Sequence, residues 1–371
     1  MTLRPVISHW SAVSAFGASA AAFTDGLRDQ LSAVSTLPGD GAAMPYPRGA
    51  VIPGFSPAAA LGKKGTRSMD RVTALAVATV GNLLADGCAD LAAGEDPLGL
   101  VLGTSNGSLQ SIMDFTRDSL VRSRPYDVDP ARFPNTVMNC AAGQCGIRYG
   151  LRGPNTTIAG GRTAALLALR YAIRMQHGRY AASLLCGAAE EFSDQRCWLD
   201  YHTERPTDPR ERVLGEGCVI FLVEPEGHAR AAGRRPLAEV LGLEFGVHGR
   251  HASPDTVLAR VITRCLDQAG LRPHDIDTVV PSQPAGELGR LESAALRSAL
   301  PGTRARWLEV ADRLGETSAA SAAFQIAALL PVPGAPAPAS AGTALVTSVD
   351  RDGSLGCALV RVRAGDEADD D

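Results

Sequence analysis

The 371-residue sequence lacks the features that mark several large classes of protein. No apolar run reaches the length that spans a bilayer, and the first residues, MTLRPVISHW, lack the long apolar core of a signal peptide. The formal net charge of −4 has the wrong sign for a general affinity for nucleic acid. We therefore expect a cytoplasmic protein that binds neither a membrane nor nucleic acid.

Signals for metals and disulfides are missing as well. The eight cysteines are scattered, with no CxxC pair and no cluster of cysteine with histidine, so we expect no metal and no cofactor. Cys140 and Cys145 are candidates for a displaced nucleophile, but without a His/Asn partner pattern they indicate buried core or interface residues. Aromatic residues make up only 5% of the chain, which favours closely packed helices over large aromatic pockets.

The sequence does contain two series of alternating strands and helices. The first includes a helix with apolar residues at helical spacing (69–90) and buried strands at 98–107, 184–191 and 217–225. A polar connection at 227–236 precedes a second series of the same kind. Alternation of this type, present twice, predicts a layered α/β fold with two similar halves.

These two series divide the chain into domains. We expect an N-terminal half at 1–230 and a C-terminal half at 231–363, the latter interrupted by a Pro/Gly/Ala-rich loop at 331–342. The last residues, 364–371, are rich in acidic side chains, and we expect them to form a disordered tail.

The stretch GPNTTIAGGRTAALLALRYA (153–172) contains the clearest candidate site. A β-prone run at 155–158 is followed by small residues and then by an Ala/Leu-rich helix. A strand that turns sharply into a helix presents a nucleophile at the helix N-terminus, where backbone N–H groups and the helix dipole favour a thiolate or an oxyanion. The residue at this elbow is Arg162, a permanent cation that cannot act as a nucleophile.

Three segments resemble parts of the β-ketoacyl synthases. They are the opening strand PVISHWSAVSAFG (5–17), the interface segment and active-site approach FPNTVMNCAAGQCGIRYGLRGPNTT (133–157), and the strand turn VLGEGCVIFLVE (213–224). Because their order and spacing extend over nearly the whole chain, the sequence is identified as a member of this family. The resemblance implies the thiolase-like fold, in which two similar βαβαβαββ halves form a layered α-β-α-β-α architecture.

The resemblance also locates the family's catalytic positions. The nucleophilic cysteine corresponds to Arg162, the two catalytic histidines to Pro281 and Glu316, and the catalytic lysine to Ala311. Condensation needs a thiolate to carry the acyl chain and histidines to stabilise the anion that develops. We therefore expect no catalytic residue in this chain, only vestigial positions at Arg162, Pro281 and Glu316.

Losses of this kind resemble those of the chain-length factor, which pairs with an active ketosynthase in type II polyketide synthases. The resemblance implies a pseudoenzyme subunit that shapes the acyl tunnel of a heterodimer, with the ketosynthase and an acyl carrier protein as partners. Chain-length factors often carry glutamine at the elbow, and this chain is shorter than typical members. These departures favour a divergent branch that serves reduced or polyene chains. The alternative is a divergent condensing enzyme or acyltransferase with an atypical active site.

The resemblance assigns expected roles to two further sets of residues. Three side chains near one face of a helix either close the partner's acyl tunnel or belong to the ordinary core: Leu109, Ile112 and Thr116. Five residues of the interface segment are candidates for contact with the partner: Phe133, Asn135, Thr136, Met138 and Asn139.

A basic cluster lies at 61–71. It either steers an acidic carrier protein or is the solvated start of a helix. Its members are Lys63, Lys64, Arg67 and Arg71.

Arg162 and Glu316 carry opposite charges at two positions that meet in one pocket of the family's fold. An isolated buried charge is very costly, whereas a paired and hydrogen-bonded charge is tolerable. We therefore predict an ion pair between these two residues that fills the vestigial site. The alternative places Arg162 on an exposed loop.

Overall fold

The computed structural model describes residues 4–37, 44–94, 96–206, 208–249, 252–336 and 341–364, so most of the expected acidic tail lies outside the described residues. Ten strands form one mixed sheet that consists of two five-stranded halves. The first half contains β1 (Pro5–Ser14), β4 (Gly99–Thr104), β5 (Asn155–Ala159), β6 (Leu184–Glu190) and β8 (Gly217–Pro225). The second contains β9 (Ala238–Val247), β10 (Thr278–Val280), β11 (Arg306–Trp307), β12 (Gly342–Val349) and β13 (Ser354–Val362).

Both halves have the same topology. In each, the first strand in sequence lies innermost and is followed outward by the fifth, fourth, second and third. The two inner pairings are antiparallel and the two outer ones parallel. The halves meet where β1 pairs with β9, through Val6 with Glu239 and Ile7 with Ala238. The structure therefore confirms two similar halves, and we propose 230/231 as the boundary between them.

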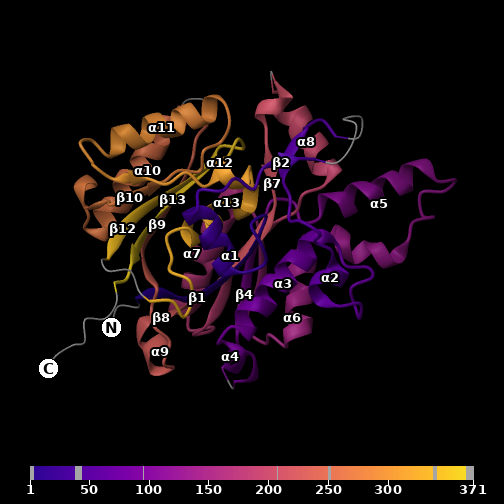
Figure 1. Ribbon diagram of the computed structural model, residues 1–371, viewed down its shortest axis with the longest axis horizontal. Coiled ribbons are helices and arrows are strands. Elements are labelled where there is room, and N and C mark those ends of the chain that lie inside the picture. Colours follow the sequence, from indigo (N-terminus) through magenta and orange to yellow (C-terminus); the bar gives the residue numbers. More distant parts are fainter. Residues whose placement is uncertain are drawn as a thin grey trace.

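Helices cover the outer face of each half-sheet and fill the space between the halves (Figure 1). The first half is covered by α3 (Arg71–Ala85) and α6 (Cys140–Tyr149), the second by α10 (Pro254–Ala269) and α11 (Glu287–Ala299), and the middle layer holds α7 (Ala164–His177) and α13 (Ser321–Ala327). Three large apolar clusters are buried against these three helix layers. The α-β-α-β-α order expected from the resemblance is thus confirmed.

Small side chains explain how two helices fit between the two halves of the sheet. Every residue of α13 is buried, and four of its seven residues are alanine or serine. The buried face of α7 includes Ala164, Ala168 and Ala172. Short side chains of this kind allow helix and strand backbones to approach closely, as the composition of the chain indicated.

Helix α3 is shorter than the helix expected at 69–90. Asp70 caps its start by accepting the N–H of Thr73 at 2.8 Å. Beyond its end, Gly87 adopts a φ of +88°, a left-handed conformation that glycine reaches without steric cost. A separate short helix, α4 (Ala89–Ala93), follows.

The other elements are short or peripheral. The remaining helices are α1 (Ala20–Arg28), α2 (Pro57–Leu61), α5 (Leu109–Val121), α8 (Asp194–Glu204), α9 (Glu226–Ala231) and α12 (Ala311–Leu314). Turns of 3-10 helix are η1 (Pro130–Thr136), η2 (Gly161–Thr163), η3 (Pro209–Glu211), η4 (Pro273–Asp275) and η5 (Ser318–Ala320). A small sheet joins β2 (Ser35–Thr36), β3 (Arg48–Ala50) and β7 (Leu214–Gly215). None of the helices in the described ranges combines the length and the apolar character that crossing a bilayer requires.

Candidate functional site

The elbow predicted from the sequence is present between β5 and α7. After Ala159 the chain turns through η2, which contains Arg162, and α7 begins at Ala164. The Arg162 side chain does not lie on the surface, because the residue is only 8% exposed. The alternative of an exposed loop is therefore wrong.

The guanidinium of Arg162 forms an ion pair with the carboxylate of Glu316, whose side chain is 9% exposed. The same carboxylate accepts the backbone N–H of Ser318 at 2.7 Å, and the carbonyl of Ser282 lies 3.4 Å from Nη1 of Arg162. The predicted ion pair is thus confirmed. Burial lowers the pKa of Arg162 to about 10, with the nearby Arg212 cation acting in the same direction, so the guanidinium stays charged at neutral pH.

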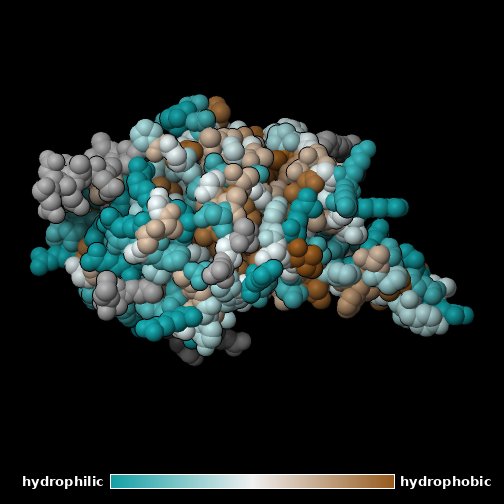
Figure 2. Space-filling view, turned by 90° about the horizontal axis from the view of Figure 1, so that it is seen from below, coloured by the Kyte–Doolittle hydropathy of each residue, from teal (hydrophilic) through white to brown (hydrophobic). Residues whose placement is uncertain are grey.

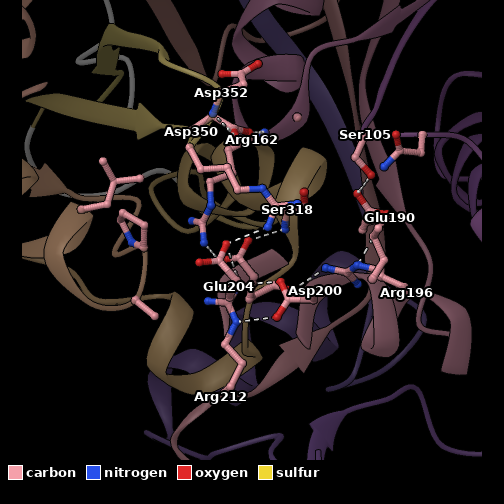
Figure 3. Close-up of a pocket in the computed structure, with 18 of the residues that line it drawn as sticks. Ser105, Arg162, Glu190, Arg196, Asp200, Glu204, Arg212, Ser318, Asp350 and Asp352 are labelled. Carbon is pink, nitrogen blue, oxygen red and sulfur yellow. Dashed lines mark hydrogen bonds and ion pairs between the residues drawn. The ribbon is translucent and has the colours of Figure 1, made fainter. Parts of the chain in front are cut away.

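The backbone N–H at the elbow has a partner that the sequence did not reveal. It donates to Oδ2 of Asp350 at 2.6 Å, from the turn between β12 and β13 (Figure 3). A Cβ atom on Gly161 would lie 2.1 Å from this oxygen, and Gly161 has a φ of +49°, so only glycine fits beside the carboxylate. The N–H that could face a thiolate or an oxyanion is therefore already bonded to a carboxylate.

A cavity of about 650 Å³ opens at the elbow. Figure 3 shows Arg212, Asp200 and Glu204 grouped on one side of it, and Ser105, Glu190 and Arg196 on another. Its charged lining consists of four arginines and seven acidic residues: Arg162, Arg196, Arg212, Arg351, Glu190, Asp200, Glu204, Glu287, Glu316, Asp350 and Asp352. Among the described residues that line it there is no cysteine, histidine or lysine.

Two ion pairs lie among these charges. Arg212 donates to both carboxylate oxygens of Asp200, at 2.9 and 2.7 Å. Burial alone would raise the pKa of Asp200, but these hydrogen bonds outweigh it and hold the pKa below its ordinary value. At the outer rim, Arg351 pairs with Glu204 at 2.7 Å, with both side chains partly exposed.

Comparison with known proteins identifies the fold that carries this cavity. Residues 6–229, more than half of the chain, match the family described as β-ketoacyl synthase, N-terminal domain. The chain belongs to the β-ketoacyl synthase family. The 3-oxoacyl-[acyl-carrier-protein] synthase 2 of Coxiella burnetii is 26% identical over 65% of this chain, and that of Vibrio cholerae is 29% identical over 54%. The matched regions span 63% and 51% of those two proteins.

Solved structures extend the relationship to almost the whole synthase fold. A structure described as the ishigamide ketosynthase/chain length factor is 39% identical, with a TM-score of 0.86 over 97% of this chain and 99% of that chain. A β-ketoacyl synthase from Burkholderia phymatum shares the fold at 23% identity, with a TM-score of 0.82 over 98% of this chain and 100% of its own. The structure of AntDE:AntF, a type II PKS acyl-carrier protein in complex with its ketosynthase, also shares the fold. It is 16% identical, with a TM-score of 0.80 over 98% of this chain and 100% of that chain.

Within this synthase fold, the structure brings some of the expected site residues together. Arg162 and Glu316 are in contact, and Ser282, directly after Pro281, borders the same ion pair. Pro281 itself is buried and does not line the cavity. Sequence reasoning missed Asp350, for which the only signal was a faint match of DRDGSLG (350–356) to a family turn.

The three tunnel candidates lie on α5 but differ in their surroundings. Leu109 lines the cavity, Ile112 is half-buried, and Thr116 is exposed. Helix α5 contains no buried side chain. The ordinary-core alternative is therefore wrong for Thr116 in the single chain.

The interface candidates lie on η1 and at the start of α6. Phe133 and Met138 are 57% and 47% exposed, Asn139 is also exposed, and Asn135 and Thr136 are half-buried. Other large apolar side chains are exposed on neighbouring elements: Met113, Leu120, Tyr126, Val137 and Ile147. Figure 2, which views the underside of Figure 1, shows apolar surface gathered right of centre on that face.

The cysteines give no support to a displaced nucleophile. All eight are free, and each is buried except Cys140, which is half-buried. Burial raises the pKa of Cys140 and of Cys145, so both thiols are held in their protonated, unreactive form.

The basic cluster divides into two parts. Lys63, Lys64 and Arg67 are exposed. Arg71 instead forms an ion pair with the fully buried carboxylate of Glu216, so it is not free to dock a carrier protein.

We expect the Arg162–Glu316 pair to behave as a buried charge pair in a double-mutant cycle. Arg162→Met or Glu316→Gln alone leaves one buried charge without its partner and should lower the free energy of unfolding by roughly 3–5 kcal/mol. The double variant should recover much of this loss. The measurement is chemical denaturation of all four proteins.

Arg351→Met provides the matched control for this cycle. It breaks an Arg–Glu pair at the rim of the same cavity, but the two side chains are 45% and 34% exposed. Its cost should therefore be at most about 1 kcal/mol. Additive effects of Arg162→Met and Glu316→Gln would contradict the coupling.

Proposed function

We propose that this chain is a non-catalytic chain-length factor of a type II polyketide synthase. In this proposal it pairs with an active ketosynthase, closes part of the tunnel that receives the growing chain, and meets the acyl carrier protein only within that complex. The ketosynthase supplies the nucleophile and the condensation chemistry. The reduced or polyene character of the product stays a prediction.

The elbow carries this proposal. Acyl transfer needs a thiolate or hydroxyl at that point and N–H groups that stabilise the oxyanion. Here the nucleophile position holds Arg162 in a buried ion pair, and the backbone N–H of Arg162 donates to the carboxylate of Asp350. The position of the nucleophile is therefore occupied by a group that cannot carry an acyl chain, and the N–H that would stabilise the oxyanion is already bonded.

The surface of the chain supports pairing with another subunit. Strand β5 is the last strand at its edge of the described sheet, and the exposed apolar residues of α5, η1 and α6 are close to it in sequence. Large apolar side chains exposed on helices that pack against one another are typical of a protein–protein interface. The printed description of the 39%-identical structure as a ketosynthase/chain length factor agrees with this role.

A second candidate function rests on one observation in the same cavity. The hydroxyl of Ser105 donates to Oε2 of Glu190 at 2.6 Å. In an acyltransferase, Ser105 Oγ would attack the thioester carbonyl while Glu190 takes its proton; the C–S bond would then break, and the leaving thiolate would receive that proton from Glu190. Glu190 also accepts the N–H of Ala319 at 3.3 Å and lies 3.8 Å from Arg196, so its carboxylate already has partners within the protein.

We expect the chain to take no acyl group from acyl carrier thioesters. In a mixture with its ketosynthase, intact-mass measurement should find the acyl adduct on the ketosynthase cysteine and none on this chain. Ser105→Ala is the control variant, because it removes the hydroxyl of the second candidate. An adduct on this chain that disappears in Ser105→Ala, or in a single Cys→Ala variant, would support the acyltransferase instead.

We expect the product length of the heterodimer to respond to Leu109, which lines the cavity at the start of α5. Leu109→Trp should shorten the products and Leu109→Ala should lengthen them, because the volume at the tunnel end changes in opposite directions. The measurement is mass spectrometry of products from purified heterodimers. Overpacking typically costs about 1–3 kcal/mol, so size-exclusion chromatography must first show an intact complex.

Arg117→Trp is the control for this experiment. Its side chain is 65% exposed and lies off the helix face shared by Leu109, Ile112 and Thr116. The control should leave product length unchanged. Equal products from all three Leu109 forms in an intact complex would remove this residue from the tunnel.

A further inference from the structure

Helix α5 is held in place without a buried side chain. It has 13 residues and none of them is buried, and Figure 1 shows it extending away from the body of the molecule. An isolated helix of this length is marginally stable in water. Its placement therefore depends on specific contacts with η1 and α8, which pack against it, and on polar bonds at its start.

Two of the polar bonds at the start of α5 come from one carboxylate, and a third is the helix cap, in which the Ser108 hydroxyl accepts the backbone N–H of Ser111 at 3.2 Å. Glu191, directly after β6, is fully buried. Its Oε1 accepts the backbone N–H of Gln110 at 2.9 Å, and its Oε2 accepts the hydroxyl of Ser108 at 3.0 Å. The N–H groups of a first helical turn have no partner within the helix and favour an anion, so this contact fixes where α5 begins.

Glu191 is itself held firmly. Its backbone carbonyl accepts Nη1 of Arg196 at 2.7 Å, and the same guanidinium donates to the carbonyls of Gly215 at 2.6 Å and Glu316 at 2.8 Å. The Ser193 hydroxyl adds a bond to Oε1 at 3.3 Å. A continuous set of hydrogen bonds thus runs from the loop of the Arg162–Glu316 pair to the first turn of α5.

A second tether lies one turn further along the helix. The side-chain amide of Gln195 donates to Oδ1 of Asp114 at 3.0 Å. It holds the middle of α5, whereas Glu191 binds residues 108 and 110 at its start. Leu109, which lines the cavity, lies between the two residues that Glu191 binds.

We infer that Glu191 is a positioning residue for chain length, which fixes the start of α5 and with it the side chain of Leu109 at the end of the tunnel. This inference rests on the proposed function, since it assigns to one residue the placement of the tunnel wall. Glu191 does not touch the growing chain.

The protonation state of Glu191 decides which substitutions are conservative. Burial raises its pKa to about 7. The charged groups that act on it are Asp70, Glu190 and Arg71. A neutral carboxyl group can still accept the Gln110 N–H and donate to Ser108, and a glutamine side chain can do the same. Leucine has a similar size but can make neither bond.

The test compares Glu191→Leu with Glu191→Gln. Hydrogen exchange is measured on the full chain alone, and product length and total turnover on the heterodimer with its ketosynthase. Glu191→Leu should speed exchange at residues 108–112 by about tenfold, because the hydrogen bonds from Gln110 and Ser108 to this side chain are both lost. It should also broaden the product lengths at unchanged turnover, whereas Glu191→Gln should keep both wild-type values.

Two further variants keep the test decisive. Glu224→Gln is the control for change at a buried carboxylate, because Glu224 binds Ser8, Ser183 and Arg234, none of which lies on α5; it should leave both readouts unchanged. If Glu191→Leu does not fold, Glu191→Asp replaces it, since it keeps the charge but shortens the reach and should give the same two changes.

The outcomes separate this inference from the proposed function. The positioning role would be overturned if Glu191→Leu kept the wild-type exchange rate and the wild-type product lengths. It would also be overturned if Glu191→Gln changed both the exchange rate and the product lengths. If Leu109→Trp still shortens the products in that case, the chain-length function stands without it. If no heterodimer forms, the proposed function fails and the chain-length role of Glu191 fails with it.

Discussion

The buried positive charge of Arg162 is the constraint on which the rest of the site depends. A cation at the start of a helix opposes the helix dipole and cannot be left in a protein interior without an anion. The carboxylate that pairs with it, on Glu316, and the carboxylate on its backbone N–H, on Asp350, both come from the C-terminal half. The elbow of the N-terminal half is thus joined to the C-terminal half by charge as well as by apolar packing.

Arg196 extends this arrangement beyond the elbow. Its guanidinium binds three backbone carbonyls, including that of Glu316, and so connects the loop of the ion pair to Glu191 and the start of α5. The Arg162–Glu316 site and the start of helix α5 therefore belong to one hydrogen-bonded network. Under the proposed function, such a network preserves the shape of a catalytic fold in a subunit that carries out no reaction.

Much of this could be predicted from the sequence, and the remainder had physical reasons to stay hidden. Alternating apolar runs are local, so the two halves and the buried strands were predictable. Pairing of Arg162 with Glu316 required the family resemblance, because the two residues are far apart in sequence. The contact of Asp350 with a backbone N–H has no sequence pattern of its own. The exposure of α5 was hidden for another reason: its amphipathic face gives no sign of whether a neighbouring element covers it.

The carboxylate on the elbow N–H has a consequence for the history of such a subunit. Replacing Arg162 by cysteine would restore a thiol but leave Glu316 without its cation and Asp350 still bonded to the N–H. Each single reversal would then be unstable or inactive, and selection could not favour it alone. Under the proposed function, the loss of catalysis is a one-way step in evolution, and dependence on the partner subunit becomes permanent.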